Sequence, residues 1–203
     1  MLKRFFALFF VCNVLLADAQ TFKAEILAGV ATSQVSGDQL AGFDKAGVIA
    51  GAGVKTRLSK KVDLGFEMYY IQKGSSKQSD VAKNDLTYYK LRLNYIEIPI
   101  LLEYHLSEKF GIELGPSVGS LIASSEEDEN GELIGQPPFI KYEVNGLGGF
   151  VYHIASNWGL HLRGEQSLLP VREHSSKVVY RLNRGQYNSV LLFALFYQFG
   201  KKN

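Results

Sequence analysis

The sequence predicts an all-β protein: an eight-stranded antiparallel up-and-down transmembrane β-barrel behind a cleaved secretory signal peptide. Eight segments alternate apolar and polar residues with the two-residue period of a strand. Short and long connections alternate strictly between these segments, which is typical of outer-membrane barrels. After the predicted signal, no segment has the ~18 unbroken apolar residues of a membrane helix. Since only helices and closed barrels satisfy their backbone in lipid, a membrane protein of this sequence must be a barrel.

The first 19 residues have the order of a secretory signal. A basic pair, Lys3-Arg4, precedes an apolar run over 5–16, and Ala17-Asp18-Ala19 is a small-x-small cleavage site. The run is shorter than the ~20 residues of a membrane helix, so we favour a signal over the alternative of a retained anchor. We expect residues 1–19 to be removed and residues 20–203 to form the barrel domain.

Composition excludes several kinds of site. The only cysteine, Cys12, lies in the predicted signal, so we expect no disulfide, thiolate metal site or lipid anchor in the mature chain. The signal removes two of the 22 basic residues and one of the 20 acidic ones, which leaves 20 against 19. Such a balance gives no reason to expect nucleic acid as a partner.

The eight predicted strands follow from their alternation and their β-branched and aromatic content. They are Phe22–Ala31, Ala46–Leu58, Val62–Lys73, Tyr88–Leu106, Phe110–Ala123, Ile140–Ile154, Trp158–Leu168 and Asn188–Phe199. Three connections are short and centre on Lys60, Glu108 and Ser156, 48 residues apart each time. The four long ones cover about 32–45, 74–87, 124–139 and 169–187. We therefore expect the short turns and both chain ends to face the periplasm, and the long loops to face out.

The position of glycine predicts which face meets lipid. In the third strand Phe66 and Met68 share one face, and Asp63 and Glu67 share the other. A soluble barrel places its apolar face inside, whereas a membrane barrel inverts this. The polar faces carry many glycines, which suit the crowded interior of an eight-stranded barrel. These are Gly51, Gly53, Gly65, Gly111, Gly115 and Gly119.

Aromatic residues near the short turns share the parity of the apolar faces. They are Tyr104, Phe110, Tyr152, Trp158, Tyr197 and Phe199, and they predict an aromatic girdle at the periplasmic lipid–water boundary. The alternative is ordinary half-buried aromatics of a soluble β protein. One segment departs from the pattern, because Leu91, Leu93 and Tyr95 lie on the parity opposite to the apolar residues from Ile96 onward. Either a bulge near Tyr95 restores the register, or this half projects beyond the membrane.

The inward faces predict a charged lumen. Its expected members are Lys55, Arg57, Glu67, Glu97, Glu113, Arg163 and Glu165. Since unpaired buried charges are costly, we expect them to form one hydrogen-bonded network that fills the barrel. A narrow proton or ion path is the alternative, because eight strands leave no porin-like channel.

The loops offer little chemistry, and we predict no catalytic, cofactor or metal site. His174 beside Ser175-Ser176 leaves open a hydrolase or acyltransferase site at the loop rim, although such residues are common in polar loops. The acidic run over 126–132 partly resembles the start of an EF-hand loop. Its twelfth position would be Pro137 instead of a bidentate glutamate, so we interpret it as a solvated acidic loop.

The segment Asn94–Tyr104, NYIEIPILLEY, resembles the signature strand of the PorT-like outer-membrane β-barrel family, also called porin family. The ADAQ that ends the signal, GPSVG at 115–119 and GLGGF at 146–150 are similar to the same family. The resemblance implies an outer-membrane barrel over the whole mature chain, commonly with no assigned activity. The founding members are linked to a protein-secretion and gliding apparatus.

The leading hypothesis is a non-enzymatic outer-membrane barrel with a structural or surface-interaction role in its long loops. Its expected partners are outer-membrane lipid, the outer-membrane assembly machinery and an unidentified surface ligand or secretion-system component. A narrow pore or secretion-apparatus component is the second hypothesis. A membrane-embedded enzyme with a site at the loop rim is the third.

Overall fold

The computed structural model describes residues 22–38, 40, 42–80, 82, 84–173 and 185–200, and the predicted signal lies outside them. Ten antiparallel strands make up the described part. They are β1 (Phe22–Ser36), β2 (Lys45–Ser59), β3 (Val62–Lys77), β4 (Tyr89–His105), β5 (Phe110–Asp128), β6 (Gly131–Glu132), β7 (Tyr142–His153), β8 (Trp158–Ser167), β9 (Arg172–Glu173) and β10 (Gly185–Gln198). No helix in the described ranges is long and apolar enough to cross a membrane.

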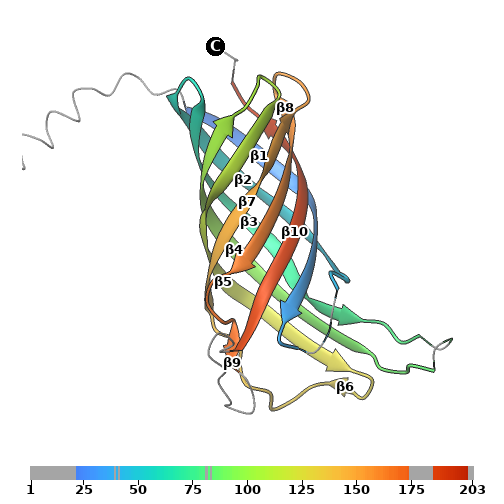
Figure 1. The fold of residues 1–203 in the computed structure, drawn as a ribbon. Helices are drawn as coiled ribbons and strands as arrows, with labels where there is room; N and C mark the ends of the chain where they lie inside the picture. Colours follow the sequence, from blue (N-terminus) through green and yellow to red (C-terminus); the bar gives the residue numbers. More distant parts are fainter. Residues whose placement is uncertain are drawn as a thin grey trace, which may run out of the picture.

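Eight long strands form a closed ring in sequence order (Figure 1). β1 pairs with β10 from Glu25↔Gln198 to Ser36↔Tyr187, so the first and last strands close the barrel. The two-residue strands β6 and β9 lie outside the ring and pair with β5 and β10. This confirms the predicted all-β, eight-stranded antiparallel barrel, in which closure removes the edges of the sheet around the ring itself.

The short and long connections lie at opposite ends of the barrel. Figure 1 shows the short turns at the end where β1 begins and β10 finishes, and the long connections at the other end. There β3, β4 and β5 extend beyond the other strands, because β3 continues to Lys77 and β5 to Asp128. The ladder between β4 and β5 continues as far as Tyr89↔Asp128, so this projecting part of the sheet is held by regular backbone pairing.

The apolar faces point outward. Phe66 and Met68 are 45% and 51% exposed, whereas Glu67 between them is fully buried. The glycines opposite the apolar faces give room to large interior side chains: a Cβ on Gly51 would lie 2.4 Å from the Cβ of Tyr69. A chain with this pattern exposes an apolar wall and buries its charges, which is the arrangement that a lipid environment requires.

The apolar residues in the anomalous half of β4 face the barrel interior. A register shift does lie between Asn94 and Tyr95 in the pairing with β5, but burial alternates without interruption along β4. Leu91, Leu93 and Tyr95 are fully buried inside the barrel, where they join the apolar cluster that includes Ile71. The interior is therefore apolar along part of its wall, and the apolar residues in this half of β4 are not lipid-facing.

Candidate functional site in the barrel interior

A central ion cluster forms around Arg163 of β8. Its guanidinium donates to both oxygens of Glu67, at 2.6 and 2.7 Å. It also donates from Nε to Glu113 Oε1 at 2.7 Å and from Nη2 to Glu113 Oε2 at 3.1 Å. His161 lies beside this cluster, with Nδ1 3.0 Å from Glu113 Oε1. Since Arg163 is 1% exposed and bridges β3 and β5 through β8, it ties three strands together across the interior.

A second cluster surrounds Lys73 of β3. Its ammonium contacts the carboxylates of Glu97, Glu143 and Glu165, which come from β4, β7 and β8. Asn188 of β10 donates to Glu143 at 2.7 Å, which brings a further strand into the same network. The ammonium lies between the three carboxylates and offsets one unit of their negative charge.

A third cation, Lys55 of β2, lies between two carboxylates. Its Nζ is 3.4 Å from Glu25 and 3.1 Å from Glu103. All three side chains are nearly fully buried. Lys55 thus joins the central interior to the end of the barrel that carries the short turns.

Most of the predicted lumen residues are buried in these clusters. Those placed inside are Lys55, Glu67, Glu97, Glu113, Arg163 and Glu165. Arg57 is the exception, since its side chain is 52% exposed and forms an ion pair with Asp63 at 2.7 Å. The reason is its position two residues before a short turn, where the interior opens and β2 shifts register between Arg57 and Ser59. The network also contains four buried residues that were not among its predicted members, namely Glu25, Lys73, Glu103 and Glu143.

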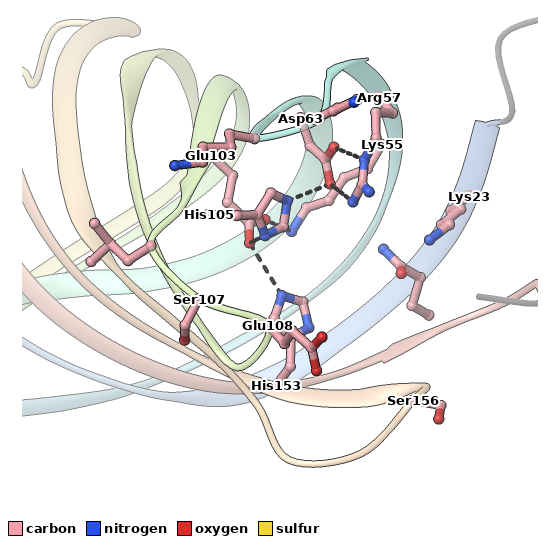
Figure 2. Close-up of a pocket in the computed structure, with 14 residues that line it drawn as sticks. Lys23, Lys55, Arg57, Asp63, Glu103, His105, Ser107, Glu108, His153 and Ser156 are labelled. Carbon is pink, nitrogen blue, oxygen red and sulfur yellow. Dashed lines mark hydrogen bonds and ion pairs between the residues drawn. The ribbon is translucent and has the colours of Figure 1, made fainter. Parts of the chain in front are cut away.

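A cavity of about 540 Å³ opens at the short-turn end, and we call it the vestibule (Figure 2). Its lining includes five basic residues, the acidic Asp63, Glu103 and Glu108, and two histidines. The basic ones are Lys23, Lys55, Arg57, Lys60 and Lys61. The vestibule is therefore a polar hollow that reaches Glu103 from the mouth of the barrel.

Figure 2 shows two histidines turned toward one carboxylate in the vestibule. His153 Nε2 of β7 lies 3.2 Å from Glu103 Oε1, and His105 Nδ1 of β4 lies 3.7 Å from the same oxygen. The other ring nitrogen of His105, Nε2, lies 2.8 Å from Asp63 Oδ2. Arg57 donates to both oxygens of Asp63 and so fixes that carboxylate. The imidazole rings are stacked, with centroids 6.0 Å apart.

The residues of the predicted girdle lie near the short turns and carry several ring contacts. Phe110 lies 4.7 Å from Tyr152 between centroids, and Trp158 lies 4.9 Å from Tyr197. Tyr197 in turn contacts Phe199 at 4.9 Å. Tyr104 is 41% exposed. Their role at a lipid–water boundary stays a prediction.

The long-loop end has a separate set of contacts. Arg172 pairs with Glu126 at 2.9 Å, and the acidic run is partly neutralised in this way. Lys77 pairs with Asp85 at 2.9 Å and lowers the pKa of that carboxyl. Burial raises the pKa of Asp38. The suggested His174, Ser175 and Ser176 site lies outside the described residues.

Sequence reasoning missed the vestibule pair His105 and His153, although a signal for it was present. Each histidine stands two residues before a short turn, and they are 48 residues apart, which is the spacing of the turns themselves. Arg57 occupies the equivalent place before the first turn. Residues at equivalent places in successive hairpins meet at one mouth of a barrel, so the spacing pointed to this convergence.

Comparison with known proteins places the fold. Neisserial surface protein A is 12% identical with a TM-score of 0.51, over 90% of this chain and 100% of that chain. Ail, the attachment invasion locus protein of Yersinia pestis, is 12% identical with a TM-score of 0.50, over 88% of this chain and 99% of that chain. At such identity these likenesses show the fold alone. No curated protein matches the chain. The family described as outer membrane protein beta-barrel domain matches residues 18–172, and the protein belongs to this family of bacterial outer-membrane barrels.

Proposed function

We propose that this protein is a non-enzymatic outer-membrane barrel with a filled polar lumen, and that its long loops carry a surface-interaction role. One observation carries the proposal: the interior holds large, fully buried side chains that are tied to one another. Arg163, Lys73 and Tyr69 are each at most 1% exposed, and Arg163 and Lys73 are each shared among several carboxylates. Moving Arg163 or Lys73 aside to admit a solute would leave buried charges unpaired, which is costly.

Planar-bilayer recording tests the filled lumen. The purified mature barrel should give no steady conductance, whereas a stable open level would overturn the proposal and favour the narrow-pore hypothesis. Tyr69→Ala, which removes a fully buried ring from the interior, serves as a comparison because it opens space without removing a charge. Heat-modifiability on a gel must show that each inserted protein is folded.

The surface role draws support from the projecting connections. Ile134 is 90% exposed and Leu86 is 67% exposed, and both lie in long connections beyond the ring of strands. Binding residues are found disproportionately on loops that a rigid scaffold positions. The PorT-like resemblance adds a secretion-apparatus component as a candidate partner, and outer-membrane lipid and the assembly machinery complete the proposed set.

The proposed orientation places the short turns in the periplasm and the long connections outside. The chain's only cysteine is Cys12 in the proposed signal over 1–19, so single cysteines report location cleanly in the mature barrel. A membrane-impermeant maleimide on intact cells should label Glu129→Cys in a long connection and leave Ser156→Cys in a short turn unlabelled until the cells are broken. Labelling of Ser156→Cys on intact cells would reverse the orientation.

A further inference from the structure

We propose that the vestibule contains a binding site for a divalent transition-metal ion of the zinc class, formed by Glu103, His105 and His153. One ligand atom from each of these residues lies within 4.8 Å of the other two. Two imidazoles and one carboxylate are a common ligand set for zinc, with a fourth position left for water. The vestibule supplies that position with solvent, because the cavity reaches all three side chains.

The distances between the ligand atoms fit a small tetrahedral ion. Two ligands that each lie ~2.0–2.1 Å from zinc are about 3.4 Å apart in a tetrahedral site. Glu103 Oε1 is 3.2 Å from His153 Nε2 and 3.7 Å from His105 Nδ1. These two distances need shifts of a few tenths of an ångström, and the ligand atoms of the two histidines lie within 4.8 Å of each other, so a closer approach of the two rings completes the site.

The hydrogen bond of His105 points its free lone pair at the proposed ion. If Nε2 donates its proton to Asp63 at 2.8 Å, Nδ1 of a neutral ring is an acceptor that faces another acceptor, Glu103 Oε1. A cation between these two atoms, or a second proton on the ring, resolves this opposition. A carboxylate behind a histidine ligand is the usual support of a zinc site, and here Arg57 holds Asp63 in place.

The surrounding charges permit a divalent cation. Lys55 contacts the other oxygen of Glu103, Oε2, at 3.1 Å and leaves Oε1 to the histidines. Glu25 shares Lys55, and Asp63 shares Arg57. These two cations stand against three carboxylates in direct contact with them. Lys23, Lys60, Lys61 and Glu108 line the wider vestibule, so the excess negative charge is confined to the groups around the proposed ligands.

Two other groups of potential metal ligands occur in the described residues, and in each of them a basic side chain already occupies the carboxylates. Glu97, Glu143 and Glu165 surround the ammonium of Lys73. In the group of Glu25, Glu67 and His161, both oxygens of Glu67 accept from Arg163. The vestibule group differs from them because it combines two histidines with an open route to solvent.

Calorimetric titration of the folded mature barrel in detergent, without a histidine tag, tests the site with ZnCl₂ near neutral pH. We expect one zinc ion per chain with micromolar or tighter affinity. His105→Ala and His153→Ala should each weaken it at least ~10-fold. Asp63→Asn, which removes the carboxylate charge behind His105 and the ion-pair partner of Arg57, should weaken it by ~10-fold or more. Glu108→Gln is the matched control, since it removes a carboxylate from the same vestibule but not from the site.

Two results would overturn the proposal. One is the absence of saturable zinc binding to a barrel that a gel shows to be folded. The other is zinc binding that both histidine variants retain, which would place it elsewhere on the chain. Cobalt(II) absorption gives an independent readout: a tetrahedral spectrum supports the site, and the spectrum of an all-oxygen octahedral ion contradicts it.

Discussion

Replacing Arg163 with methionine removes the central cation of the interior and leaves two carboxylates buried without it. The guanidinium makes four hydrogen bonds to Glu67 and Glu113, with distances from 2.6 to 3.1 Å. Removing one partner of a buried ion pair typically costs about 3–5 kcal/mol, because the remaining charge loses its compensation. Since two carboxylates are affected here, we expect the free energy of unfolding of Arg163→Met to fall by about 5 kcal/mol.

Urea unfolding of the barrel in lipid vesicles measures this loss through the fluorescence of Trp158, the only tryptophan. Arg57→Met is the matched control, because it removes an arginine–carboxylate pair whose arginine is 52% exposed, and it should cost only about 0–1 kcal/mol. Adding Glu67→Gln and Glu113→Gln to Arg163→Met should restore most of the lost stability. If Arg163→Met and Arg57→Met lower the free energy of unfolding by the same amount, the interior cluster does not stabilise the barrel.

Three further predictions concern the wall, the packing and the loop end. Leu114→Arg places a charge on the outward face, where Leu114 is 71% exposed, and should lower the free energy of unfolding in vesicles by about 2–4 kcal/mol. An unchanged urea midpoint would argue against a lipid-facing wall. Gly115→Ala puts a Cβ 1.9 Å from the carbonyl oxygen of Ile100, so we expect a loss of about 1–3 kcal/mol or more in the same assay. The pKa of Asp85, measured by NMR titration, should lie below its ordinary range because Lys77 favours the charged carboxylate, and Lys77→Met should raise that pKa. Any contribution of this pair to stability is present at neutral pH and is lost only as the pH falls through the lowered pKa.

The ring of strands was predictable because its signals are local. Alternation and turn length fix each strand and its faces without knowledge of the partner strands. Strand ends were harder to place: β1 continues from the predicted end at Ala31 to Ser36 because its ladder with β10 runs to Ser36↔Tyr187. Backbone pairing across the chain's two ends thus extends a strand through polar residues that resemble a loop.

The interior was predictable in its residue types but not in its pairs. Parity along each strand placed Glu67 and Arg163 inside, yet their ion pair joins residues 96 positions apart. Which inward residues meet depends on the stagger between strands, and no single strand carries that information. Lys73 was missed for a simpler reason, because it ended a predicted strand that in fact continues to Lys77.

The proposed vestibule site and the proposed loop surface are at opposite ends of the barrel, with the ion clusters around Arg163 and Lys73 between them, so the two inferences can be tested separately. An ion that reaches Glu103 must enter from the short-turn end, because the buried clusters around Arg163 and Lys73 occupy the interior beyond it. Changes in the long connections should therefore leave zinc affinity unchanged. Conversely, His153→Ala should not alter any partner bound by the loops. Coupling between the two ends would require the interior clusters to rearrange, and their several buried ion pairs oppose such a movement.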